Sequence, residues 1–176
     1  VLFSPKMSYL KGLEGKFLPV FWSPVHFPRQ AGTMGLLCNT QHAALRHFPT
    51  EMHSNWQWWS IVRHARPFIL NATRHEYKPL IQVVDNVERN HKLGLLFEFA
   101  VDNGKVLVCM SNLEAIRHTP EGGQLRNAIL NYMKSAEFSP TETLTSQQLQ
   151  HILTTEVRKQ DIVGVKNQSD YDVQPE

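Results

Sequence analysis

The sequence predicts an α/β domain with a mixed central sheet and flanking helices. Short runs rich in β-branched and aromatic residues recur between positions 35 and 110, and such runs are typical of strands. Two of them are joined by Asp-Asn-Gly at 102–104, a pattern that favours a hairpin. Two later segments have helical periodicity. These helices argue against the alternative fold, an all-β sandwich of the carbohydrate-binding kind.

The expected elements follow along the chain. Residues 1–5 read as a short strand, and residues 43–48 as one helical turn. The segment 15–28 contains three prolines, which lack the N–H that a central strand needs, so we expect an edge or a wrapping arm there. The remaining strands are expected at 35–38, 67–71, 80–85, 93–101 and 105–110, and the helices near 56–65, 123–135 and 146–157.

Side-chain spacing predicts which face of each element is buried. In the strand 93–101 the odd-numbered residues are apolar, whereas Glu98 points to the other face, which we expect to be polar. Thr145 followed by Gln148 forms a capping box at the last helix. The helical stripes comprise Trp58, Ile61, Val62 and Ala65; Leu125, Ile129, Leu130 and Met133; and Leu149, Ile152, Leu153 and Val157.

Length and composition suit one globular domain. The 176 residues include 41% hydrophobic and 19% charged residues, with a net charge of +2. We expect a single domain over 1–157 and a polar tail over 158–176. The chain opens at Val1 without an initiator Met or a signal peptide, so we expect a piece of a larger protein. The absence of a basic block and of a long apolar run predicts neither nucleic acid nor membrane as a partner.

No residue pattern in the chain spells out a catalytic site. A glycosidase needs two facing carboxyl groups, and the spacing of the four carboxylates nearest the predicted sheet selects no pair; they are Asp85, Glu88, Glu98 and Asp102. Gly122 and Gly123 precede a predicted helix and could offer N–H groups to an anion, but no phosphate-binding motif surrounds them. We therefore predict no catalytic residue in this chain.

The cysteines and histidines predict neither a metal site nor a reactive thiol. Cys38 and Cys109 lie in apolar, strand-like runs, which favours buried free thiols over a disulfide or a nucleophile. Cys38, His42, His47 and His53 are ligand types, but their irregular gaps differ from the tight pairs of a structural zinc site. We predict no metal and no cofactor.

The most distinctive stretch is HSNWQWW, residues 53–59, which holds three of the four tryptophans. We expect a helix entry at which Ser54 or Asn55 caps the N-terminus and Trp58 enters the core. Trp56 and Trp59 lie at different angles around the helix axis. They are therefore candidates for an interface or a sugar-stacking role, or for covering the proline-rich arm at 15–28.

Four segments, spread over the region from Val1 to about Phe138, together resemble a known family. Their most distinctive blocks are FWSP, NWQWW and KLGLLFE. These segments are similar to the C-terminal region of large bacterial glycoside hydrolases of family two, the β-galactosidase-like type of Bacteroidetes. The order of elements also resembles the later half of a glutamine-amidotransferase-like (flavodoxin-like) α/β domain. That family's Cys–His–Glu set is not recognisable here.

The resemblance implies a role beside an enzyme. In such hydrolases the catalytic glutamates lie in an upstream barrel, and its Asn-Glu pair is absent from this chain. The implied role is a non-catalytic accessory domain of a hydrolase acting on β-galactosides or related plant or host glycans, in the periplasm or cell envelope. Its implied partners are the upstream catalytic domain of the same polypeptide or a sister subunit. The alternative is a carbohydrate-binding module that uses Trp56 or Trp59.

Overall fold

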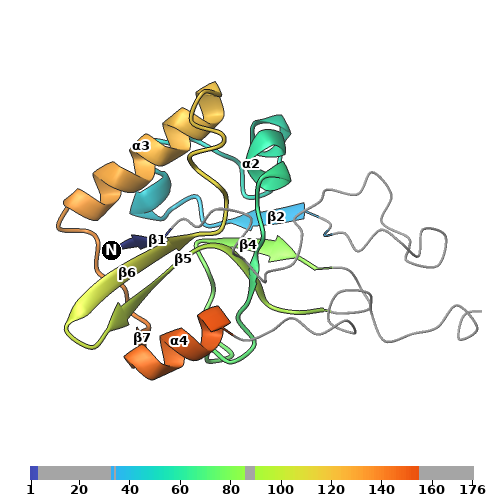
Figure 1. Ribbon diagram of the computed structural model, residues 1–176. Helices are drawn as coiled ribbons and strands as arrows, with labels where there is room; N and C mark the ends of the chain where they lie inside the picture. The colour runs from blue at the N-terminus through green and yellow to red at the C-terminus, as the bar shows by residue number, and fades with distance from the viewer. Residues whose placement is uncertain (4–32, 34, 86–89, 155–176) are drawn as a thin grey trace, which may run out of the picture.

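A computed structural model describes residues 1–3, 33, 35–85 and 90–154 (Figure 1). Within these residues the chain forms a mixed sheet of seven strands with helices on both faces. Figure 1 shows α2 and α3 above the sheet and α4 below it. The predicted α/β class is confirmed, and the β-sandwich alternative is wrong because helices cover the sheet. The predicted arm at 15–28 and tail at 158–176 lie outside the described residues.

The hairpin of β5 (Leu93–Val101) and β6 (Gly104–Cys109) forms the centre of the sheet. β4 (Ile81–Val84) and then β2 (Gly35–Cys38) extend the sheet on one side. β1 (Leu2–Phe3) pairs with β6 on the other side. The five strands lie within one or two residues of the bounds that the sequence predicts, because alternation and turn residues fix them locally.

Three further pairings involve β5. β4 and β3 (Phe68–Ile69) both pair with its first half. β7 (Thr143–Leu144) pairs in parallel with its end, at Ala100 and Val101. β7 was not predicted, because two residues carry no alternation to detect. Parallel β1 and β7 beside antiparallel neighbours make the sheet mixed.

Strand direction differs from that of an amidotransferase-like or flavodoxin-like domain. Those sheets consist of parallel strands joined by crossover helices. Here β5 runs antiparallel to β4 and to β6, which are its main neighbours. The resemblance to such a domain therefore extends to the α/β class but not to the strand directions of the described residues.

The turn between β5 and β6 is a two-residue loop. Val101 pairs with Gly104, and Asp102 adopts a left-handed backbone with φ of 48°. Asp is one of the few side-chain-bearing residues that tolerate this region. The Asp102 carboxylate also accepts a hydrogen bond from the Ser146 hydroxyl at the start of α4. The predicted hairpin is confirmed, and its turn also anchors the last helix.

Short helices on one face of the sheet carry the aromatic cluster. The 3-10 turn η3 (Trp56–Trp58) leads directly into α2 (Trp59–Arg63). A second 3-10 turn, η2 (Ala43–Leu45), contacts the long helix α3 (Pro120–Lys134). The predicted stripe of Trp58, Ile61, Val62 and Ala65 is buried throughout.

α3 begins three residues earlier than predicted. The Thr119 hydroxyl accepts a hydrogen bond from the Gly122 N–H at 3.1 Å, and Pro120 is tolerated in a first turn. A Cβ atom on Gly122 would lie 2.1 Å from the Ile116 carbonyl oxygen. Gly122 therefore permits close backbone packing. Its N–H is not free to bind an anion, because it donates to the Thr119 hydroxyl.

Two helical faces differ in detail from the predicted stripes. In α3, Leu125 and Ile129 are buried as expected, but Ala128 and Tyr132 replace Leu130 and Met133 as the inner residues.

α4 (Ser146–Thr154) packs through Leu149, Ile152 and Leu153. Its predicted capping box is confirmed, since the Gln148 side chain accepts from the Thr145 N–H at 2.8 Å and the Thr145 hydroxyl from the Gln148 N–H at 3.2 Å. Val157 lies outside the described residues.

The prediction that Glu98 lies on a polar face is wrong. Both faces of β5 are covered, and Glu98 is only 6% exposed. Its side chain points to the face on which Tyr132 of α3 lies. The periodicity of the strand identified one buried face, but only packing against α3 and η2 buries the second.

Candidate functional site

Trp58 is a core residue, as the sequence predicts. The Asn55 side chain caps η3 by accepting from the Gln57 N–H at 3.2 Å, and Trp58 is completely buried. Its indole N–H donates to the Thr50 hydroxyl at 2.8 Å. Its ring meets Phe48 edge-on with centroids 5.1 Å apart. The indole therefore has both the apolar surroundings and the acceptor that a buried tryptophan requires.

Trp56 and Trp59 remain at the surface. Trp56 is 84% exposed and Trp59 is 41% exposed. Their rings are 6.0 Å apart and inclined by 62°, so they do not form one flat platform. The Arg63 guanidinium lies 5.6 Å above the Trp59 ring, a cation–π contact that covers part of it.

Two further apolar side chains are exposed on neighbouring segments. Leu37 is 53% exposed and Met52 is 71% exposed. Leu37 forms a bridge with His53, and the Cys38 N–H donates to the Met52 carbonyl at 2.8 Å, so these segments lie side by side. We call Leu37, Met52, Trp56 and Trp59 the tryptophan surface. Clustered apolar exposure of this kind marks interaction sites.

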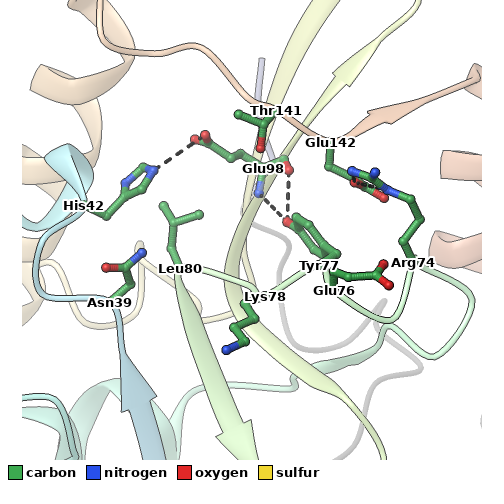
Figure 2. A pocket seen from close by; sticks show the side chains of 10 residues that line it. All are labelled: Asn39, His42, Arg74, Glu76, Tyr77, Lys78, Leu80, Glu98, Thr141 and Glu142. Atoms are coloured by element: carbon green, nitrogen blue, oxygen red, sulfur yellow. Dashed lines mark hydrogen bonds and ion pairs between the residues drawn. The ribbon is translucent and has the colours of Figure 1, made fainter.

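A second candidate lies where the sheet opens along one edge of β5. β4 pairs with β5 as far as Leu96, and β7 begins at Ala100. A cavity of about 240 Å³ lies at this opening. Figure 2 shows side chains converging on it from β5 and from the three segments that follow β2, precede β4 and precede β7. We call it the Glu98 pocket; its main polar residues are Asn39, His42, Arg74, Glu98, Thr141 and Glu142.

Tyr77 replaces the missing strand at this opening. Its hydroxyl donates to the Glu98 backbone carbonyl at 3.0 Å and accepts from the Glu98 N–H at 3.3 Å. Its ring packs against Phe99 with centroids 5.2 Å apart. Burial raises the pKa of Tyr77 far above its ordinary value, so the hydroxyl stays protonated and able to donate.

The Glu98 side chain forms one wall of the pocket. The Tyr132 hydroxyl lies 3.0 Å from one carboxylate oxygen and 2.9 Å from the other. Burial raises the pKa of Glu98, against the opposing effects of the Tyr132 hydrogen bond and the positive charge of Lys105. A carboxyl group in this environment holds a proton at higher pH than an exposed glutamate does.

His42 faces Glu98 across the pocket, as Figure 2 shows. Its Nδ1 accepts from the Ala44 N–H at 3.3 Å and so caps η2, which leaves Nε2 to carry the proton of the neutral ring. Nε2 lies 3.8 Å from a Glu98 oxygen, too far for a hydrogen bond. Burial lowers the pKa of His42, although the charge of Glu137 opposes this shift. The ring is thus neutral at ordinary pH.

The opposite wall is an ion pair. Arg74 Nε donates to Glu142 Oε2 at 2.8 Å, and Arg74 Nη2 also contacts that oxygen. Glu142 is only 3% exposed. A buried carboxylate needs such a partner. Glu142 is therefore neutralised by Arg74, unlike Glu98, and the two carboxylates have different surroundings within one cavity.

The sequence held only a partial signal for this pocket. Glu98 is the one charged residue in an apolar strand run. The sequence offers it as a candidate carboxylate but gives it no partner. The residues that complete the pocket come from loops, one of which precedes β7, and no local pattern joins them. Sequence reasoning missed Tyr77, Arg74 and Glu142 for this reason.

The remaining candidates have structural roles or lie outside the described residues. Asp85 is buried and accepts from the His91 N–H at 3.1 Å. Cys38 and Cys109 are buried free thiols, as predicted. His42 caps η2, while His53 is an exposed residue near Glu51. The described residues contain no group of three His, Cys, Asp or Glu side chains that could hold a metal ion. Glu88 lies outside the described residues.

Comparison with known proteins places the chain in a family. The model of a family described as a domain of unknown function (DUF8487) matches residues 1–154. The chain belongs to this family. No curated protein matches the chain at a significant level. Among the helices of the described part, none has the length and apolar character needed to cross a membrane.

Proposed function

We propose that this domain is a non-catalytic accessory domain that docks on the catalytic barrel of a glycoside hydrolase, within the same polypeptide. The hydrolase would act on β-galactosides or related plant or host glycans. The observation that carries the proposal is the tryptophan surface, where Trp56 is 84% exposed beside the ring of Trp59. Leu37 and Met52 are exposed on neighbouring segments. Tryptophan is enriched at the centres of protein interfaces, where its burial contributes strongly to binding. The resemblance to glycoside hydrolases of family two supports the choice of partner.

Protein docking suits this surface better than sugar stacking. The two rings are inclined by 62°, whereas a sugar platform needs a flat aromatic face and several convergent polar groups. Two nearby polar side chains are already occupied, because Asn55 caps η3 and Gln57 donates to the Pro49 carbonyl at 3.0 Å. These two groups are therefore not free to bind a sugar.

The test is a binding experiment with the barrel encoded in the same reading frame. The barrel is expressed as a separate polypeptide and titrated with this chain by isothermal calorimetry. We expect a 1:1 complex that Trp56→Ala weakens at least about tenfold, a loss of 1.4 kcal/mol or more. His47→Ala, an exposed change outside the tryptophan surface, is the matched control and should leave the affinity unchanged. A reading frame without a hydrolase barrel, or a barrel that does not bind, would refute the proposal.

The alternative is a carbohydrate-binding module that uses Trp56 or Trp59. The observation in its favour is that both rings are accessible and adjacent. Titration of the chain with galactosides and plant oligosaccharides, followed by tryptophan fluorescence, distinguishes the two roles. Saturable binding that Trp59→Ala abolishes, with no affinity for the barrel, would favour the alternative.

A further inference from the structure

The Glu98 carboxylate has unused capacity to accept hydrogen bonds. It is 94% buried, and Tyr132 is its only hydrogen-bond donor among the described residues. One hydroxyl carries one proton, so it serves one carboxylate oxygen at a time, although a carboxylate can accept about four hydrogen bonds. His42 Nε2 is 3.8 Å away, which is too far to donate a further hydrogen bond. A donor inside the pocket would add to the hydrogen bond that Tyr132 supplies.

The other walls combine donors and acceptors with balanced charge. Arg74 and Glu142 neutralise each other, and the oppositely charged Lys78 and Glu76 also line the pocket. Asn39 adds an amide and Thr141 a hydroxyl, each of which both donates and accepts. An anionic ligand would face the Glu98 and Glu142 carboxylates, and a cationic ligand would face the Arg74 guanidinium. A neutral ligand with several hydroxyl groups is repelled by neither kind of charge, and it can pair with donors and acceptors alike.

The dimensions of the pocket restrict the ligand further. Pockets for drug-sized molecules usually span about 300–1,000 Å³. A cavity of about 240 Å³ therefore suits a smaller molecule, while it far exceeds the space of a single water. Leu80 and the Tyr77 side chain supply its less polar lining. We infer that the Glu98 pocket binds a small neutral polyol of about the size of one monosaccharide, which donates a hydroxyl hydrogen bond to Glu98.

This inference goes beyond the proposed docking role. The docking role uses Trp56 and Trp59, whereas the polyol site uses residues at the opening between β4 and β7. Failure of one does not entail failure of the other. A chain that binds the hydrolase barrel but no polyol would retain the proposed function and lose this inference.

The experiment is an NMR titration of the ¹⁵N-labelled chain, residues 1–176. The probes are D-galactose, D-glucose and glycerol, with methylammonium chloride as a cationic comparison. We expect at least one polyol to give saturable shifts at Tyr77, Glu98 and Thr141, with a dissociation constant of about 1–10 mM. The matched variants are Thr141→Val, an exposed and isosteric change, and Glu98→Gln, which keeps the side-chain volume.

The variants decide the outcome. We expect each folded variant to weaken polyol binding at least about fivefold, and Trp56→Ala to leave it unchanged. Thr141→Val keeps the test decisive if Glu98→Gln fails to fold. The inference is overturned by the absence of saturable shifts up to about 100 mM, by shifts centred on Trp56 and Trp59, or by binding that survives Thr141→Val. Saturation by methylammonium alone would also overturn it, because the site would then select a cation.

Discussion

The Tyr77 hydroxyl forms hydrogen bonds with both backbone groups of Glu98, at 3.0 Å to the carbonyl and 3.3 Å from the N–H. One side chain thereby substitutes for a strand where β4 has ended and β7 has not begun. Backbone groups in a sheet need such partners because an unpaired buried donor or acceptor is costly. This contact lets the sheet open without loss of its hydrogen bonding, and it makes room for the Glu98 pocket.

Removal of this hydroxyl should destabilise the domain. We expect Tyr77→Phe to lower the free energy of unfolding by about 1–3 kcal/mol, because two backbone groups lose their partner while the ring packing is kept. Urea denaturation followed by circular dichroism measures the change. Trp56→Ala, at an exposed position, serves as the control and should shift stability by less than about 0.5 kcal/mol. If Tyr77→Phe left the free energy of unfolding unchanged, water would have to replace the hydroxyl fully.

Trp58 should contribute far more to stability than its two neighbours. Trp58→Ala removes a completely buried indole and its hydrogen bond to Thr50, and we expect a loss of about 3–5 kcal/mol. Thr50→Val, which keeps the indole but removes its acceptor, should cost about 1 kcal/mol. Thermal denaturation of both variants tests this order. Equal effects for Trp58→Ala and Trp56→Ala would contradict the placement of the cluster.

Glu98 should make the domain less stable as the pH rises. Its pKa in the folded state lies above the ordinary value of 4.5, so between these two pKa values the folded state holds a proton that the unfolded state has released. Stability from this group is therefore greatest at acid pH and is lost as the pH rises through the folded-state pKa. Glu98→Gln should remove this dependence. The measurement is the difference in unfolding free energy between wild type and variant from about pH 4 to about pH 8.

That difference isolates Glu98 from other carboxyl groups. Glu137, for example, has a lowered pKa because of its hydrogen bond with Arg46, and its contribution runs in the opposite direction. Both proteins retain Glu137, so its effect cancels when the two curves are subtracted. A flat difference across the range would show that the Glu98 pKa is ordinary in the folded chain.

The two cysteines should resist modification in the native state. Burial raises the pKa of Cys38 to about 11 and that of Cys109 to about 12. The reactive thiolate is therefore scarce as well as shielded. We expect negligible labelling by a thiol reagent at neutral pH, and labelling of two thiols per chain in urea. Rapid labelling of one thiol in the folded protein would locate an opening that exposes it.

The isolated chain should not hydrolyse glycosides. Glu142 is held by Arg74, so it is not a free partner carboxyl for Glu98, and glycoside hydrolysis needs two such groups. We expect no nitrophenol release from nitrophenyl galactosides above the buffer rate. Turnover that Glu98→Gln abolishes would instead establish Glu98 as catalytic and would require a different partner carboxyl.

Local patterns in the sequence determined most of the elements. The alternation in 93–101, the Asp-Asn-Gly turn and the stripe beginning at Trp58 each act over a few residues, so the chain itself carries their signal. The same holds for the Thr145–Gln148 capping box. In HSNWQWW, local spacing also distinguished the buried Trp58 from Trp56 and Trp59, since one helical face cannot bury all three.

Only the tertiary structure decided the environment of Glu98. Its neighbours Tyr77, Tyr132 and Glu142 come from separate parts of the chain, and pairing over such distances leaves no periodicity in the sequence. The short strand β7 and the second buried face of β5 depend on the same long-range packing. A charged residue in an apolar strand signals a special position, but burial, hydrogen-bond partners and pKa are set by the residues that the fold brings to it.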